Sequence, residues 1–335
     1  MWTRRGFCYP SVKGAPPAKR RRISSNSRSD LFETLPDDLV ISILTKLSSS
    51  ASSPSHLFNA FLTCKRFNNL GAHPEVLANA SEKSLQVRAK SWSKSAQDFL
   101  DRCANAGNVE ACYLLGMIQF YCLRNFISGA DLLARAALSN HPTALYSLAV
   151  IHFNGSGRPY CHRDPSTGAA LCAKSAALGN IDALREVGYC LQDGLGLPFC
   201  PSAAHRLLIK ANAIELITKK KRIGPQLNYK HRRGYCCRLN MDTSSNVHQA
   251  NRFMVEWWGL AGTKAENEVG LNMCSHALCG RRETRRHEFR RCAVCAVVAY
   301  CSRACQAMHW KMEHRTRCRP AQDPADVVGA EPEGA

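Results

Sequence analysis

The C-terminal part of this 335-residue chain contains a regular series of seven cysteines and one histidine. They form four close pairs: Cys274-x4-Cys279, Cys292-x2-Cys295, Cys301-x3-Cys305 and His314-x3-Cys318. Thiolate and imidazole are ligands that Zn²⁺ prefers, and a short spacing lets two side chains from one turn bind the same ion. The series therefore predicts two tetrahedral zinc sites.

A segment this short cannot build a stable apolar core. Metal binding is therefore expected to supply its folding free energy, on the order of 10 kcal/mol per structural site. Protein side chains fill all four positions of each predicted site, whereas a catalytic zinc keeps one position open for water or substrate. We expect two structural zinc ions and a module that works through its surface.

The ligand series, together with Tyr300-Cys301-Ser-x-x-Cys305-Gln306-x-x-x-Trp310, resembles the MYND finger over residues 271–318. The resemblance implies interleaved sites, with Cys274, Cys279, Cys301 and Cys305 on one zinc and Cys292, Cys295, His314 and Cys318 on the other. The first pair departs from the family in its wider gap. The resemblance also implies that Gln306 and Trp310 line a groove for proline-containing peptides, although Trp310 could instead be core. His276, His287 and His309 are not expected to bind metal.

The chain contains 18 cysteines, but nothing indicates an oxidising compartment. Residues 1–29 lack the apolar core of a secretory signal, and no stretch approaches the ~18 apolar residues of a membrane span. We therefore interpret the cysteines as thiols or metal ligands and expect no membrane association.

The net charge of +19 is concentrated in blocks. They lie at Lys19–Arg22, between Lys219 and Arg238, and around the ligand series at Arg281, Arg282, Arg285, Arg286, Arg290 and Arg291. Such blocks can attract nucleic acid or acidic proteins, but solubility and nuclear import also explain them. We find no base-reading module, so nucleic acid is not the expected partner. Residues 16–23 are typical of an import signal, which predicts a nuclear and/or cytoplasmic protein.

Order is expected to begin near Leu31. Pro36 suits the first turn of a helix, with Asp37 and Asp38 near the positive end of its dipole. Apolar residues then recur at helical spacing. A serine-rich loop at 48–55 precedes a second apolar helix over 57–70.

The Leu-Pro-x-x-Leu-x-x-x-Ile-Leu start and the Cys-Lys-Arg-Phe end of this segment are similar to the F-box motif, in a match that extends from Leu31 to Leu70. The serine-rich loop is longer and more polar than the family's usual turn. The resemblance implies docking on the Skp-type adaptor of an SCF ubiquitin ligase through Leu35, Pro36, Leu39, Ile43, Leu44 and Phe67. The alternative is an ordinary helical pair packed on the next domain.

Three segments with an anchor alanine recur farther along the chain. The anchors are Ala111, Ala144 and Ala183. Their spacing lies inside the period of helical solenoids, which is about 20–50 residues. Each anchor opens an apolar helix that an alanine-rich helix follows. Glycine turns at 155–157 and 194–196 separate the two helices in the second and third units.

This pattern resembles the Sel-type relatives of tetratricopeptide repeats, with an irregular helical bundle as the alternative. Residues 122–127 replace the glycine turn in the first unit, which we interpret as degenerate or capping. Arrays of this kind present a concave surface that usually binds peptides or partner proteins.

We therefore expect a mainly α fold: N-terminal F-box helices, a short α-solenoid of helical-hairpin repeats, and a small C-terminal zinc cross-brace module. The predicted divisions are a disordered basic N-terminus (1–30), the F-box (31–72), a connecting helix or linker (73–103), Sel-like repeats (104–215), a basic linker and amphipathic helix (216–270), the MYND finger (271–318) and a disordered acidic tail (319–335). Phe253, Met254, Trp257 and Trp258 are expected to pack toward a core.

These parts predict a non-catalytic substrate-recognition subunit of an SCF-type ubiquitin ligase. It would bind a Skp-type adaptor, and through it a cullin ligase, by the F-box and a client protein by the repeats, the finger or both. The alternative is a nuclear scaffold or transcriptional co-regulator that uses the finger without ligase activity. No SET-type motif, phosphate-binding glycine loop or nucleophile elbow indicates an enzyme. The sequence does not name the client.

Overall fold

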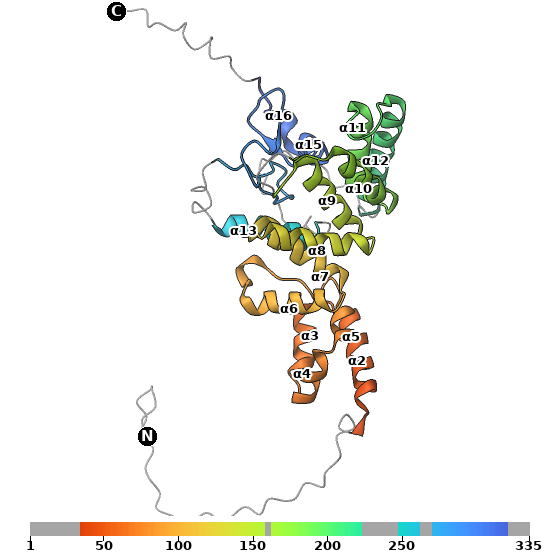
Figure 1. Cartoon of the computed structure of the whole chain (residues 1–335), viewed down its shortest axis with the longest axis vertical. Coiled ribbons are helices and arrows are strands. Elements are labelled where there is room, and N and C mark those ends of the chain that lie inside the picture. Colours follow the sequence, from red (N-terminus) through yellow and green to blue (C-terminus); the bar gives the residue numbers. More distant parts are fainter. Residues whose placement is uncertain (1–33, 158–161, 223–246, 262–269, 321–335) are drawn as a thin grey trace, which may run out of the picture.

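A computed structural model describes residues 34–157, 162–222, 247–261 and 270–320. It is mainly helical, and Figure 1 shows the N-terminal helices at the opposite end of the molecule from the C-terminal module. The predicted import signal and acidic tail, and the basic block beyond Arg222, lie outside the described residues. In the part of the chain that is described, no helix is long and apolar enough to span a membrane.

The predicted F-box segment begins with α2 (Asp37–Ser50), which Pro36 immediately precedes. Asp37 and Asp38 lie in its first turn, as predicted. The serine-rich stretch differs from the prediction, because α2 continues through Ser50 and residues 51–53 alone connect it to α3 (Pro54–Phe61). Ser48 is buried and its Oγ donates to the carbonyl of Val76 at 2.9 Å. That bond lets a serine occupy a core position at the end of the helix.

The second predicted helix of this segment is in fact two helices, α3 and α4 (Lys65–Gly71), which are followed by α5 (Pro74–Ala78). Cys64 interrupts it, because its sulfur accepts a hydrogen bond from the Phe67 N–H as the cap of α4. Arg66 then reaches back to α2, where Nε donates to Asp37 Oδ1 at 2.9 Å and Nη2 to the Leu35 carbonyl at 2.5 Å. The two ends of the F-box motif therefore hold each other in place.

The three predicted repeats are helix pairs: α7 (Val109–Met117) with α8 (Phe126–Leu138), α9 (Pro142–Asn154) with α10 (Pro165–Ala177), and α11 (Ile181–Asp193) with α12 (Pro201–Arg222). Each first helix begins with the same cap, a polar side chain that accepts from the N–H of the buried anchor alanine at the third position after it. The distances are 2.9 Å for Asn108 and Ala111, 3.1 Å for His141 and Ala144, and 2.9 Å for Asn180 and Ala183.

The first helices of the units end in two ways. Gly155 and Gly194 terminate α9 and α11 at left-handed φ angles of 62° and 69°, as the glycine turns predict. In the first unit the π-helix η2 (Ile118–Cys122) extends α7, and Arg124 takes the left-handed conformation at φ 60°. The last helix, α12, continues to Arg222, so it covers the start of the predicted basic linker.

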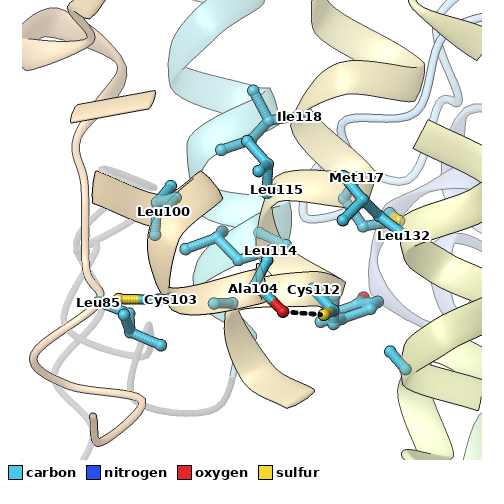
Figure 2. Close-up of a cluster of buried hydrophobic side chains, with 14 of the residues drawn as sticks. Leu85, Leu100, Cys103, Ala104, Cys112, Leu114, Leu115, Met117, Ile118 and Leu132 are labelled. Carbon is cyan, nitrogen blue, oxygen red and sulfur yellow. Dashed lines mark hydrogen bonds between the residues drawn. The ribbon is translucent and has the colours of Figure 1, made fainter. Parts of the chain in front are cut away.

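Every residue from Ala111 to Cys122 is buried. A helix that is apolar all round must be covered on all sides. Here α6 (Lys94–Asn105), α8 and α13 (Gln249–Ala261) surround α7 and η2. Figure 2 shows the side chains that α6 and α7 contribute, with the Cys112 sulfur 3.7 Å from the Ala104 carbonyl that accepts its hydrogen bond. The predicted linker over 73–103 thus contains α5, the 3₁₀ turn η1 (Ala89–Ser91) and most of α6.

The C-terminal module has little regular structure. Its elements are the antiparallel strands β1 (Arg290–Arg291) and β2 (Ala299–Tyr300), then α15 (Arg303–His309), the π-helix η4 (Trp310–His314) and α16 (Arg315–Arg317). The preceding α13 buries Phe253 and Met254, as predicted, and Trp257 packs partly buried against the same core. Figure 1 places this module beside α9 to α12.

Asn108 joins the F-box helices to the repeats. It caps α7, and its Nδ2 also lies within 3.1 Å of the Leu77, Ala78 and Ala80 carbonyls at the end of α5. We expect Asn108→Ala to lower the free energy of unfolding by about 2 kcal/mol or more, because it removes a cap and leaves buried carbonyls unpaired.

Denaturant unfolding measures this effect, and Asn180→Ala is the matched control. Asn180 caps α11 in the same way but does not reach α5, so its loss should cost about 1 kcal/mol. Equal costs for the two variants would show that the bonds from Asn108 to the end of α5 contribute nothing.

Candidate zinc centres and docking surfaces

The first predicted ligand set, Cys274, Cys279, Cys301 and Cys305, converges on one point, with all ligand atoms within 4.8 Å of one another. Sulfur–sulfur distances are 3.6 Å from Cys279 to Cys301 and 3.6 Å from Cys301 to Cys305. A tetrahedron with zinc–sulfur bonds of about 2.3 Å has sulfur–sulfur edges of about 3.8 Å, whereas a disulfide bond is about 2 Å long. The four buried sulfurs therefore fit a tetrahedral zinc ion.

The second set, Cys292, Cys295, His314 and Cys318, also converges within 4.8 Å. The Cys292 and Cys318 sulfurs are 3.9 Å apart, and the Cys295 sulfur lies 3.6 Å from His314 Nε2. The chain crosses between the two groups, as the resemblance implied, and the wider first pair still converges. Four protein ligands leave no open position for a substrate, so both sites are of the structural kind. When bound, the two zinc ions would hold the module together.

The three other histidines of this segment stay outside both groups. His309 is the nearest: its Nδ1 lies 3.0 Å from the Tyr300 hydroxyl, and its ring stacks on His314 at a centroid distance of 5.4 Å. His287 is exposed at a left-handed φ of 61°, and His276 is partly buried. His309 thus packs against the ligand His314 and lies outside both ligand groups.

The finger is docked on the first helices of the repeats through buried polar contacts. Glu186 of α11 accepts hydrogen bonds from the N–H groups of Arg303 and Ala304, at 3.3 and 3.0 Å, and burial raises the pKa of its carboxyl. On α9, the Tyr146 hydroxyl donates to Ser302 at 3.0 Å. The backbone at the start of α15 is therefore fixed by two repeats.

The glycine turn after α9 forms the second part of this interface. Glu288, which is 1% exposed, accepts from the N–H of Thr284 at 2.7 Å and also pairs with Ser156. Thr284 in turn accepts from the N–H of Gly157 at 2.8 Å, and Arg285 donates to the Gly155 carbonyl at 2.7 Å. Residues 155–157 therefore end a helix and bind the finger.

This docking corrects two expectations from the sequence. The repeats were predicted to offer a concave surface to a partner, but α13 and the finger cover the surface of α7, η2, α9 and α11. The third basic block is also partly structural: Arg281 and Arg282 are buried, and Arg285 bonds to the glycine turn. The coverage of α7 and η2 could have been predicted from residues 111–122, which are apolar on nearly every face of the helix.

Gln306 and Trp310 both line a groove of about 430 Å³ between the finger and α11. The other lining residues are Tyr189, Gln192, Asp193, Arg290, Arg303, Ala307 and Lys311. Trp310 is 40% exposed, so its side chain is not the core of the module. Two of the positively charged side chains of the groove form ion pairs with the third repeat: Arg303 pairs with Asp193 and Lys311 with Glu215. The groove is therefore built jointly by the finger and the third repeat.

The six predicted adaptor residues divide by exposure. Pro36, Leu39 and Ile43 are exposed on one face of α2, with Leu39 at 51% and Ile43 at 44%. Leu35 and Phe67 are partly buried against the core. Leu44 is 2% exposed, so it would support adaptor binding by holding α2 in place and not by contact.

A third group of possible metal ligands joins Glu110 to His141 and His248, with Glu110 oxygens 3.2 and 3.0 Å from the two Nε2 atoms. Each Nδ1 accepts a backbone N–H, from Ala144 and Ala250, both at 3.1 Å. In each neutral ring the proton is then on Nε2, where it is donated to Glu110. A metal ion would need a free lone pair on that nitrogen. The group is a hydrogen-bonded clamp that holds the start of α13 against the first repeat.

The helix pairs and the two ligand groups define a helical-repeat protein that carries a two-zinc finger. The MYND finger family model matches residues 274–318, and the model of plant tetratrico peptide repeats matches residues 82–163, which includes α6. Two F-box proteins of Arabidopsis thaliana are 46% and 49% identical to this chain over 92% and 90% of its length, covering 88% and 90% of their own. The chain belongs to this family of plant F-box proteins with tetratricopeptide- or Sel-like repeats and an MYND finger.

Among solved structures, a Sel1 repeat protein from Oxalobacter formigenes is 21% identical and aligns with a TM-score of 0.33. The alignment covers 38% of this chain and 96% of that one. The repeat architecture of this protein rests on its own helix pairs and caps, since so low a score adds no support.

The clamp at Glu110 predicts a pH-dependent contribution to stability. Burial alone would raise the pKa of its carboxyl, but hydrogen bonds from His141 and His248 outweigh this and lower the pKa to about 2. The contribution is complete above the ordinary pKa of 4.5 and is lost as the pH falls toward 2. At pH 7, Glu110→Gln should lower the free energy of unfolding by about 1–3 kcal/mol, because each ring pairs with a different carboxylate oxygen and the amide replaces one of these acceptors with an N–H donor.

The matched control is Glu82→Gln. Glu82 lies 4.0 Å from the same His248 ring, but its side chain is 55% exposed. Thermal and denaturant unfolding at pH 7 should show almost no change for this variant. A Glu110→Gln protein as stable as the unchanged chain would contradict the clamp.

Proposed function

We propose that this protein is a substrate-recognition subunit of an SCF-type ubiquitin ligase, and that it contributes no catalytic group of its own. The observation that carries the proposal is the exposed apolar face of α2 in a chain of the F-box family. Leu39 and Ile43 together expose large aliphatic side chains beside Pro36. Exposed apolar side chains gathered on one face are typical of a protein-binding surface.

The proposed client site lies at the other end of the molecule. The groove at Gln306 and Trp310 is open and combines an aromatic ring with polar side chains, which suits a short proline-containing segment. Because the finger and α13 cover the first helices of the repeats, the groove is a better candidate for client binding than that surface. Figure 1 shows that the F-box helices and the finger are far apart, so adaptor and client could bind together.

A nuclear scaffold or transcriptional co-regulator would use the same groove without an adaptor. Nothing described favours it over the ligase subunit, and adaptor binding separates the two. A nuclear and/or cytoplasmic location remains our proposal from residues 16–23, which lie outside the described residues.

The adaptor surface can be tested by co-purification with a Skp-type adaptor. Leu39→Ala with Ile43→Ala should reduce recovery of the adaptor at least tenfold, because the contact loses two large apolar side chains. Leu35→Ala with Pro36→Ala should also abolish recovery. Leu138→Ala is the matched control, since Leu138 is 81% exposed at the end of α8, outside the F-box helices. Unchanged recovery with the α2 variants would favour the scaffold.

The groove can be tested by calorimetric titration of the full chain with Pro-x-Leu-x-Pro peptides. We expect Trp310→Ala to weaken binding at least tenfold, because the aromatic wall of the groove is lost. Met312→Ala is the matched control: it lies on the same short helix and is 51% exposed, but it does not line the groove. If both variants bind as the unchanged chain does, or if no peptide binds to it, the groove is not the client site.

A further inference from the structure

Arg281 lies between the first zinc cluster and the repeats, with 3% of its surface exposed. Its Nη1 donates toward the sulfurs of Cys279 and Cys301, at 3.7 and 3.8 Å. Its Nη2 donates to Ser147 Oγ on α9, at 2.9 Å. One side chain thus bonds to two predicted zinc ligands and to a repeat helix.

The surroundings of this guanidinium are aromatic. Its central carbon is 5.9 Å from the ring centroid of Tyr121 and 5.7 Å from that of Tyr146, both in the repeats. Within the described ranges, no carboxylate forms an ion pair with Arg281. An arginine stays charged in proteins, and a buried charge without a counter-charge is strongly destabilising.

The ligand sulfurs are the available counter-charge. Four thiolates around one Zn²⁺ leave a formal charge of about −2, which faces the guanidinium directly. Without the ion, the four sulfurs are no longer held as one thiolate cluster. The stability of the buried arginine, and of the contact with α9 that it makes, should then depend on the metal.

We propose that Arg281 couples zinc binding at the Cys274, Cys279, Cys301 and Cys305 site to the docking of the finger on the repeats. The loaded site holds the guanidinium against Ser147, Tyr121 and Tyr146, and loss of the ion weakens that contact. The second site has no such coupling, since no repeat residue forms a hydrogen bond with its four ligands in the described structure. The two zinc sites therefore have different roles. Both stabilise the fold of the finger, and the first also strengthens the docking of the finger on the repeats.

Thermodynamic linkage makes this coupling reciprocal. If zinc strengthens docking by some factor, docking must strengthen zinc affinity by the same factor. A substitution in α9, outside the finger, should therefore weaken zinc binding at the first site. A purely structural role for Arg281 inside the finger does not predict that effect.

The test is a zinc competition titration of the full chain against a chromophoric chelator of known affinity. Arg281→Met keeps most of the side-chain volume and removes the charge, so zinc affinity at one of the two sites should fall roughly 10- to 100-fold. Arg281→Lys should restore part of the loss. Substitution by Co²⁺ identifies the weakened site, because a tetrathiolate and a Cys3His site absorb at different wavelengths.

Two buried serines provide the decisive comparison. Ser147→Ala removes the α9 hydroxyl that accepts from Arg281, and it should weaken zinc binding at the first site only. Ser175→Ala is the matched control, because Ser175 is equally buried and donates to the Pro142 carbonyl at 2.7 Å without touching the finger. Unchanged affinity in Arg281→Met, or equal effects of the two serine variants, would overturn the proposal.

Discussion

The structure depends on the buried polar contact between the zinc finger and the first helices of the repeats. A module as short as the finger has too little apolar surface to define its own position. Glu186 of α11 accepts from the backbone of the finger, Glu288 of the finger pairs with Ser156 of the repeats, and Arg281 joins the first metal site to α9. Because buried polar groups are costly unless they are paired, these contacts favour one orientation of the finger on the repeats. The wall that α11 contributes to the groove at Trp310 follows from that orientation.

The repeats accordingly serve as a platform. Helical arrays bury their apolar faces by stacking neighbouring units, and they usually leave one face free for partners. In this protein the chain's own C-terminal part covers that face, and the two surfaces that we propose for partner binding lie at the two ends. The apolar face of α2 lies at one end and the groove at Gln306 and Trp310 at the other. This separation fits a subunit that holds a client away from its adaptor.

Several short sequence motifs in this chain have two roles: each shapes the local backbone and also contacts a segment that is distant in sequence. The Cys-Lys-Arg-Phe motif caps α4 through Cys64, and its Arg66 also fixes the start of α2. The glycine turn at 155–157 ends α9 and binds the loop that contains Glu288. Asn108 caps α7 and also bonds to the end of α5. In each case the local role was predictable from backbone chemistry, while the second role needed a partner from a distant part of the sequence.

The sequence by itself determined most of the helices, the repeat period and the two sets of metal ligands, because these features depend on local spacing and on side-chain chemistry. It predicted a loop at Ser48 and one helix over 57–70, and it missed the buried bond to Val76 and the cap at Cys64 that decide those boundaries. Tertiary structure alone decided which surfaces stay open. Burial of Leu44, exposure of Trp310 and the coverage of α7 depend on segments distant in sequence, and residue periodicity carries no information about which distant segment will pack there.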